Sequence, residues 1–183
     1  EIEDDEILSE GCVDWIGFSY YQSIVTAYTS EGKSVMNGNL KGGLKNDFLE
    51  ATEWGWQIDP LGLRTLCNRL YDRYNKPLFI LENGIGRVEI LNDDSTVHDD
   101  YRITYLRDHL ANVKRAIQDG CEILGYTWWG PIDLISSGTS EMSKRYGFIY
   151  VDQDEDGQGS KKRYKKDSYN YYKHLIETNG EEL

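Results

Sequence analysis

The chain has 183 residues, and its 32 acidic against 20 basic residues give a formal net charge of −12. Hydrophobic residues make up 39% and aromatic residues 13%, which is enough for one packed domain and argues against a disordered chain. The acidic excess argues against a nucleic acid partner, no apolar run approaches the ~20 residues that span a bilayer, and no secretory signal opens the chain.

Apolar runs and helical spacings predict alternating strands and helices. In chain order, the predicted elements are a strand over residues 13–21, a helix from Asp59-Pro60 to Tyr74, a strand over 77–82, a helix from Asp99-Asp100 to Gly120, a strand over 122–129 and a helix over 167–178. The strands are mostly apolar rather than alternating, as in sheets that are covered on both faces. The order indicates an α/β fold with a parallel sheet and helical crossovers.

The number of predicted strand–helix units limits the architectures that the chain can form. Two polar loops, over residues 28–54 and 85–97, separate elements, and we find no internal repeat and no domain boundary within 1–183. Three strand–helix units are too few for a closed barrel, which typically needs roughly 250 residues. The pattern therefore predicts either a small open sheet or part of a barrel.

Residues of chemical interest close each predicted strand. Tyr20-Tyr21 ends the first strand, Glu82 the second and Trp128-Trp129 the third. Because the carboxyl ends of parallel strands meet at the rim where α/β folds place active sites, we expect these side chains to gather there. Each also has a plainer interpretation, which is a carboxylate facing water for Glu82 and core packing for the aromatic residues.

A second group follows the third strand. Ser136-Ser137 and Lys144-Arg145-Tyr146 place two hydroxyls, two cations and a phenol within eleven residues. Lys and Arg commonly bind phosphate, so this group could surround an anion. A solvated basic turn is the alternative interpretation.

No metal or cofactor site is expected. Residues 152–157 resemble the start of a calcium loop, but Arg163 occupies the twelfth position, where such loops carry Glu. We therefore predict a hairpin turn there, followed by a solvated edge strand over 161–166. The three histidines share no ligand spacing, and no nucleotide-binding glycine motif is present.

The cysteines indicate a compartment. Cys12, Cys67 and Cys121 are far apart and form neither a disulfide framework nor a zinc spacing. An odd count of this kind fits a reducing environment, so we expect a cytoplasmic protein.

Several motifs, in the right order, resemble family-1 glycoside hydrolases, the (β/α)8 TIM-barrel β-glycosidases. The matching segments are residues 14–21 for the sixth strand, Leu81-Glu82-Asn83-Gly84 for the seventh-strand motif, residues 125–133 for the eighth strand, Asp100-Tyr101-Arg102-Ile103 and Lys166-Asp167-Ser168. The resemblance implies that residues 1–183 are the C-terminal portion of such a barrel, strands six to eight with their helices.

The resemblance also implies roles for the strand-end residues. Glu82 would be the nucleophile of a retaining mechanism, attacking the anomeric carbon to form a covalent glycosyl-enzyme. Tyr21 would hydrogen-bond that carboxylate, and Trp129 would stack on the sugar. Ser19 stands where most relatives have Asn.

The residues that follow the eighth strand narrow the class of substrate that the resemblance implies. Most β-glucosidases of the family have Glu-Trp where this chain has Ser136-Ser137, and Lys144 and Tyr146 complete a set similar to that of the 6-phospho-β-glycosidases. The small Ser137 points to 6-phosphoglucosides, whereas relatives acting on 6-phosphogalactosides tend to carry Trp there. The expected substrate is a small phosphosugar, such as cellobiose 6-phosphate or an aryl-β-glucoside 6-phosphate, in carbohydrate catabolism.

One part of the family pattern is absent. Strands one to five, with the Asn-Glu-Pro motif that carries the acid/base, have no counterpart in this sequence. We therefore expect the chain alone to be inactive and to self-associate through exposed barrel edges. The alternative is a non-catalytic sugar-phosphate-binding remnant.

Overall fold

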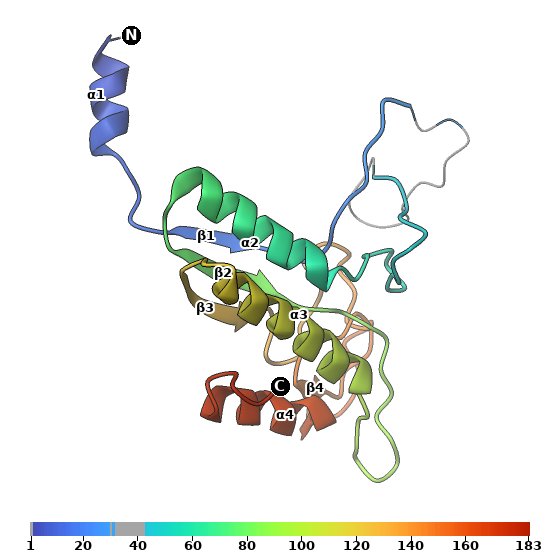
Figure 1. Cartoon of the computed structure of the whole chain (residues 1–183). Helices are drawn as coiled ribbons and strands as arrows, with labels where there is room; N and C mark the ends of the chain where they lie inside the picture. The colour runs from blue at the N-terminus through green and yellow to red at the C-terminus, as the bar shows by residue number, and fades with distance from the viewer. Residues whose placement is uncertain (1, 30, 32–42) are drawn as a thin grey trace.

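A three-stranded parallel sheet lies at the centre of the computed structural model, which describes residues 2–29, 31 and 43–183 (Figure 1). The elements are α1 (Ile2–Glu10), β1 (Ile16–Ser19), α2 (Pro60–Tyr74), β2 (Leu78–Asn83), α3 (Asp100–Gln118), β3 (Ile123–Trp128), β4 (Ile149–Val151), β5 (Arg163–Lys165) and α4 (Asp167–Glu177). The sheet order is β1-β2-β3, and both pairs are parallel. The predicted α/β alternation is therefore confirmed.

The first strand is shorter than predicted. β1 covers Ile16–Ser19, not 13–21, because its pairing with β2 begins at Ile16 and its register shifts between Phe18 and Ser19. The pairing then continues as one backbone hydrogen bond from Tyr20 N to Glu82 O at 2.8 Å. This shift lies at the carboxyl end of the strands, where the candidate site residues emerge.

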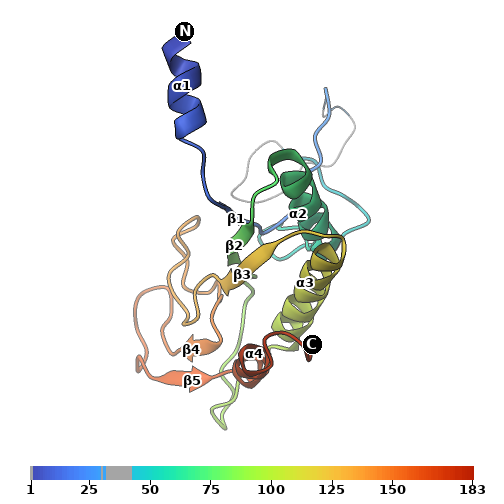
Figure 2. The same cartoon turned by 60° about the vertical axis from the view of Figure 1, so that its left-hand side comes forward.

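Helices α2 and α3 cover one face of the sheet, as the two views show (Figures 1 and 2). Leu78 and Ile80 of β2 are fully buried there against Leu63 of α2 and Val113 of α3. The amphipathic spacing that predicted both helices thus corresponds to their buried stripes. Each fully buried side chain of this size stabilises the fold by roughly 1.5–3 kcal/mol.

The opposite face of the sheet is open. Trp15 and Leu81 are 44% and 43% exposed, and within the described ranges no helix packs over them (Figure 2). Gly125 of β3 lies opposite Phe79, and a Cβ there would come within 2.8 Å of the Phe79 ring. Glycine therefore lets an aromatic ring lie flat across the neighbouring strand, which is a way of filling the inside of a barrel.

Helix α1 was not predicted. It runs over Ile2–Glu10 and projects away from the sheet and its helices (Figures 1 and 2). Ile7 and Leu8 are 68% and 70% exposed, so this helix lacks the buried stripe that makes helices recognisable in a sequence. Among the described residues, no helix combines the length and the apolar character needed to cross a membrane.

The predicted hairpin after β3 is confirmed, and of the predicted solvated segment 161–166 all but Lys166 is exposed or half-exposed. β4 and β5 pair in antiparallel fashion, and residues 152–162 connect them. Lys166, expected on a solvated edge strand, is instead buried and forms ion pairs with Glu89 and Asp133. The expectation was wrong because these carboxylates come from distant segments, which charge patterning along the chain does not show.

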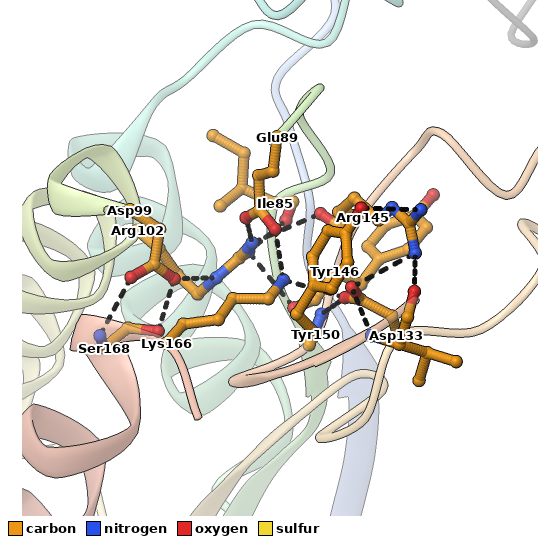
Figure 3. A network of polar contacts seen from close by, with 12 residues as sticks. Ile85, Glu89, Asp99, Arg102, Asp133, Arg145, Tyr146, Tyr150, Lys166 and Ser168 are labelled. Atoms are coloured by element: carbon orange, nitrogen blue, oxygen red, sulfur yellow. Dashed lines mark hydrogen bonds and ion pairs between the residues drawn. The ribbon is translucent and has the colours of Figure 1, made fainter. Parts of the chain in front are cut away.

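Lys166 belongs to a buried polar network centred on Arg102 (Figure 3). Arg102 donates from Nε to Asp99 at 2.9 Å and from Nη1 to the carbonyls of Ile85 at 2.9 Å and Tyr146 at 3.1 Å. Its Nη2 also pairs with Glu89. The network joins the segment after β2, the start of α3 and the segment before β4.

Buried His109 predicts a pH dependence of stability. It stacks on Tyr105 with ring centroids 3.8 Å apart, and burial lowers its pKa from 6.5 to about 4. Because the unfolded chain binds this proton near pH 6.5 and the folded chain does not, the contribution of His109 is intact above pH 6.5 and declines as the pH falls to about 4.

We therefore expect the stability advantage of the parent chain over His109→Gln to shrink between pH 7 and pH 4 by up to about 3 kcal/mol. Urea titrations of both chains at several pH values measure this difference. A difference that stays constant across this range would contradict the assignment of a neutral, buried His109.

Candidate active site

Glu82 and Tyr21 meet at the carboxyl end of the sheet. Tyr21 follows β1, Glu82 lies near the end of β2, and the Tyr21 hydroxyl donates to Glu82 Oε2 at 3.1 Å. Burial and the neighbouring Glu82 carboxylate raise the pKa of Tyr21, so the phenol keeps its proton and remains a donor. The pair is a half-buried carboxylate oriented by a hydrogen bond from a phenol.

Asn83 fixes the strand end that carries Glu82. Its side chain is fully buried, and Nδ2 donates to Tyr20 O at 2.6 Å and to the Tyr105 hydroxyl at 2.9 Å. Its Oδ1 accepts from the Tyr126 hydroxyl at 2.7 Å. One side chain thus ties β2 to β1, β3 and α3, which orients the adjacent Glu82.

Trp56 connects this carboxylate to the second group of candidate residues. Its ring lies edge-on to Tyr21, with centroids 5.1 Å apart, and 6.5 Å from the ring of Tyr146. Lys144 Nζ lies 4.0 Å from the centroid of Trp56. Tyr21, Trp56, Lys144 and Tyr146 therefore form one chain of contacts from Glu82 to the segment before β4.

Lys144 is a buried cation without an ionic partner. Its residue is 1% exposed, it lies over the rings of Trp54 and Trp56, and within the described residues Nζ has no hydrogen-bond partner. Burial lowers its pKa from 10.5 to about 8, and the nearby Glu141 opposes this shift. The interpretation as a solvated turn is therefore wrong for Lys144, which is arranged to receive an anion.

Ser136 and Tyr146 complete this pocket. Ser136 is buried, and its Oγ lies 3.4 Å from the Tyr146 hydroxyl. Gly86 makes room for the pocket, because a Cβ there would meet Lys144 Cγ at 2.7 Å. A hydroxyl, a phenol and an ammonium group thus lie together at the rim, all able to donate hydrogen bonds to an oxyanion.

Three residues that the sequence predicted for the site lie apart from this group. Ser137 is exposed, and no hydrogen bond joins its side chain to another described residue. Arg145 points away, donating to the carbonyls of Val151 at 2.8 Å and Gln153 at 2.6 Å, so only one of the two predicted cations faces the pocket. Trp129 is half-buried directly after β3 and donates from its backbone to Asn83 O at 2.8 Å.

The loop residues Trp54 and Trp56 were not predicted as part of the site. Two tryptophans in a glycine-containing polar segment are a compositional signal, because large aromatic residues outside regular elements need a partner surface. Spacing alone could not show that the partner is Lys144. The contact joins residues almost ninety positions apart along the chain.

The other carboxylates near the site are engaged elsewhere. Glu89 lies in the predicted polar loop over 85–97, but its side chain is buried and paired with Arg102 and Lys166. Glu141 accepts a hydrogen bond from Trp54 Nε1 at 2.6 Å, and Glu53 one from Arg87 at 3.2 Å. Across the part of the chain that the structure describes, no group of three or more His, Cys, Asp or Glu side chains is arranged for a metal ion.

Comparison with known proteins places this arrangement in context. The family model described as Glycosyl hydrolase family 1 matches residues 1–181. The chain is 58% identical over 180 residues to the aryl-phospho-beta-D-glucosidase BglH of Bacillus subtilis, covering 98% of this chain and 38% of the relative. It is 56% identical over 185 residues to the 6-phospho-beta-glucosidase of Clostridium longisporum, covering 99% and 39%.

A solved structure shows the same fold. The family 1 b-glucosidase from Thermotoga maritima superimposes with a TM-score of 0.81 at 28% identity, covering 99% of this chain and 38% of that chain. The chain thus spans less than two fifths of the length of the relatives that it matches.

Proposed function

This chain belongs to glycosyl hydrolase family 1 and has the α/β fold of strands six to eight of its TIM barrel, and we propose that it supplies the nucleophile and the phosphate-binding pocket of a 6-phospho-β-glucosidase. The observation that carries this proposal is the chain of contacts from Glu82 through Tyr21 and Trp56 to Lys144, whose ammonium group has no hydrogen-bond partner among the described residues. The similarity to an aryl-phospho-beta-D-glucosidase and to a 6-phospho-beta-glucosidase supports the same substrate class.

In the proposed reaction, Glu82 attacks the anomeric carbon of the sugar. The glycosidic bond breaks as the carboxylate forms a covalent glycosyl-enzyme, and water then releases glucose 6-phosphate with retention of configuration. Tyr21 orients the attacking carboxylate through its hydrogen bond of 3.1 Å. Trp129, directly after β3, supplies the stacking surface for the sugar ring.

The phosphate group would lie in the pocket beside Trp56. Lys144 supplies the positive charge, and the hydroxyls of Ser136 and Tyr146 donate hydrogen bonds to phosphate oxygens. A phosphate dianion next to the buried ammonium group favours its protonated form and offsets the cost of its burial. We place Ser137 at the edge of this pocket, where its small side chain leaves room for a glucoside.

The proposal assigns the acid/base to another part of the barrel. Retention needs two carboxyl groups roughly 5–5.5 Å apart, and among the described residues Glu82 is the carboxylate that lies at a strand end within the candidate site. The open face with Trp15 and Leu81 is where we propose that the remaining barrel strands pack. We further propose a cytoplasmic role in carbohydrate catabolism, which the three free cysteines support.

Removing the charge of Lys144 tests phosphate recognition. A suitable enzyme is a chimera in which this chain replaces the corresponding 38% of the Bacillus subtilis relative. For Lys144→Met we expect KM for an aryl β-glucoside 6-phosphate to rise about 10- to 100-fold, because a charged hydrogen bond of ~1.5–3 kcal/mol is lost. Hydrolysis of the unphosphorylated glucoside should not decrease.

Lys45→Met is the matched control, because Lys45 is exposed and its ammonium group pairs with Asp47 on the surface. It should leave KM for both substrates unchanged. Equal losses for the phosphorylated and the unphosphorylated glucoside in Lys144→Met would contradict a phosphate-binding role for Lys144.

A further inference from the structure

The segment that carries Lys144 belongs to no helix or strand. Residues 142–147 run between β3 and β4, and their backbone must nevertheless hold the Lys144 ammonium group 4.0 Å from the centroid of Trp56. After Lys144, the backbone of Arg145 forms an isolated antiparallel bridge with Arg87, with N–O distances of 3.0 and 3.2 Å. The described residues directly before Lys144 have no such backbone pairing, so other groups must fix the backbone there. The structure shows which groups these are.

Glu155 binds the backbone directly before Lys144. It lies in the connection between β4 and β5, and its two carboxylate oxygens accept from two consecutive amides, Met142 N at 2.7 Å and Ser143 N at 2.8 Å. These hydrogen bonds lower the pKa of Glu155, so the carboxylate is ionised at neutral pH. Both carboxylate oxygens of Glu155 thus bind the backbone of residues 142–143.

The same hairpin also binds the residue directly after Lys144. Arg145 donates to the carbonyls of Val151 and Gln153, and its guanidinium group lies 4.4 Å from the centroid of the Tyr150 ring (Figure 3 shows Arg145 beside Tyr150). The residues on both sides of Lys144 are therefore bound to the hairpin that β4 and β5 form. Arg145 is buried, whereas Glu155 is exposed and takes no part in the hydrophobic core.

We propose that Glu155 is a positioning residue that holds Lys144 against Trp56 and so shapes the phosphate pocket from outside it. The inference rests on the proposed function for the identity of the anion, but the positioning of Lys144 is a separate physical claim. Glu155 does not contact the pocket itself; its effect passes through the amides of Met142 and Ser143. Without these two hydrogen bonds, the backbone of residues 142–147 becomes more mobile and the Lys144 side chain becomes more accessible to water.

The test compares Glu155→Ala with Asp156→Ala in the full chain. Asp156 is the neighbouring exposed carboxylate, and its side chain makes no hydrogen bond or ion pair with any described residue, so it controls for the loss of one charge. The first readout is the titration of Lys144, followed by NMR with ¹³C-labelled lysine and assigned with Lys144→Arg. The second is the Kd for glucose 6-phosphate.

For Glu155→Ala, we expect the pKa of Lys144 to rise from about 8 toward its ordinary 10.5, because the ammonium group becomes hydrated. We expect Kd for glucose 6-phosphate to rise about fivefold to tenfold, the loss typical of one or two hydrogen bonds. Glu155→Gln, which keeps one carbonyl acceptor, should fall between the two. Asp156→Ala should match the parent chain in both readouts.

The outcomes separate the two claims. An unchanged Lys144 titration in folded Glu155→Ala would overturn the positioning role, and so would loss of cooperative unfolding in both Glu155 variants, which would show a general structural role. If the Lys144 pKa rises as expected but the parent chain does not bind glucose 6-phosphate, the positioning role stands and the proposed phosphate specificity fails.

Discussion

The Glu82→Gln variant of the chimera with the Bacillus subtilis relative is expected to hydrolyse an aryl β-glucoside 6-phosphate at least about 10⁴-fold more slowly than the parent chimera. Glutamine preserves the shape of the side chain and an oxygen that can accept from Tyr21, but its amide does not attack the anomeric carbon. Release of the coloured aglycone under saturating substrate measures the loss. KM should change little, because the phosphate pocket is intact.

The matched control is Glu53→Gln. Glu53 is an exposed carboxylate whose hydrogen bond to Arg87 lies outside the catalytic pair, so its substitution should leave kcat within about twofold, as for most surface changes. Comparable activity in Glu82→Gln and in the parent would contradict the nucleophile assignment. Absence of activity in the parent chimera, together with retained phosphosugar affinity, would instead favour a non-catalytic sugar-phosphate-binding role.

The Arg102→Met variant is expected to lower the free energy of unfolding by about 3–5 kcal/mol, because removing one partner of a buried ionic network leaves the others unpaired. Arg102 is fully buried, and its loss would leave the buried carboxylate of Asp99 without its ionic partner and that of Glu89 with Lys166 as its remaining cation among the described residues (Figure 3). It would also leave the carbonyls of Ile85 and Tyr146 without this donor. Urea denaturation followed by tryptophan fluorescence measures the change.

Arg107→Met is the control on the same helix. Arg107 is half-exposed and pairs only with its neighbour Asp108 among the described residues, so its loss should cost at most about 1 kcal/mol. Similar effects of the two substitutions would show that the buried network contributes nothing beyond an ordinary surface ion pair.

The helices and strands whose apolar side chains face the core could be predicted from the sequence. Leu63 and Val113 recur at helical spacing because they pack on the sheet, and the same burial makes β2 an apolar run. Helix α1 has no such buried stripe and was missed. The length of β1 was overestimated because both ends of its pairing with β2, the start at Ile16 and the register shift at Ser19, depend on the neighbouring strand, which local sequence does not encode.

One part of the candidate site could likewise be predicted from the sequence, and another part could not. Glu82 and Tyr21 could be predicted to meet because parallel strands end at one rim, and the structure joins them by a hydrogen bond. The burial of Lys166 and the contact of Lys144 with Trp56 depend on residues far away in the sequence. Hydropathy predicts that a lysine in a basic run is exposed to solvent, so the burial of Lys166 and the contact of Lys144 with Trp56 were not predicted.

Covalent trapping tests the central claim most directly. A dinitrophenyl 2-deoxy-2-fluoro-β-glucoside 6-phosphate has a leaving group that needs no protonation, so the nucleophile and the phosphate pocket alone determine whether the sugar is captured. We predict that mass spectrometry of the treated chimera finds the fluoroglucosyl phosphate on the peptide containing Glu82, and that the unphosphorylated reagent labels it far more slowly. Label on a different carboxylate, or equal labelling by the two reagents, would contradict the assignment of Glu82 and of the pocket around Lys144.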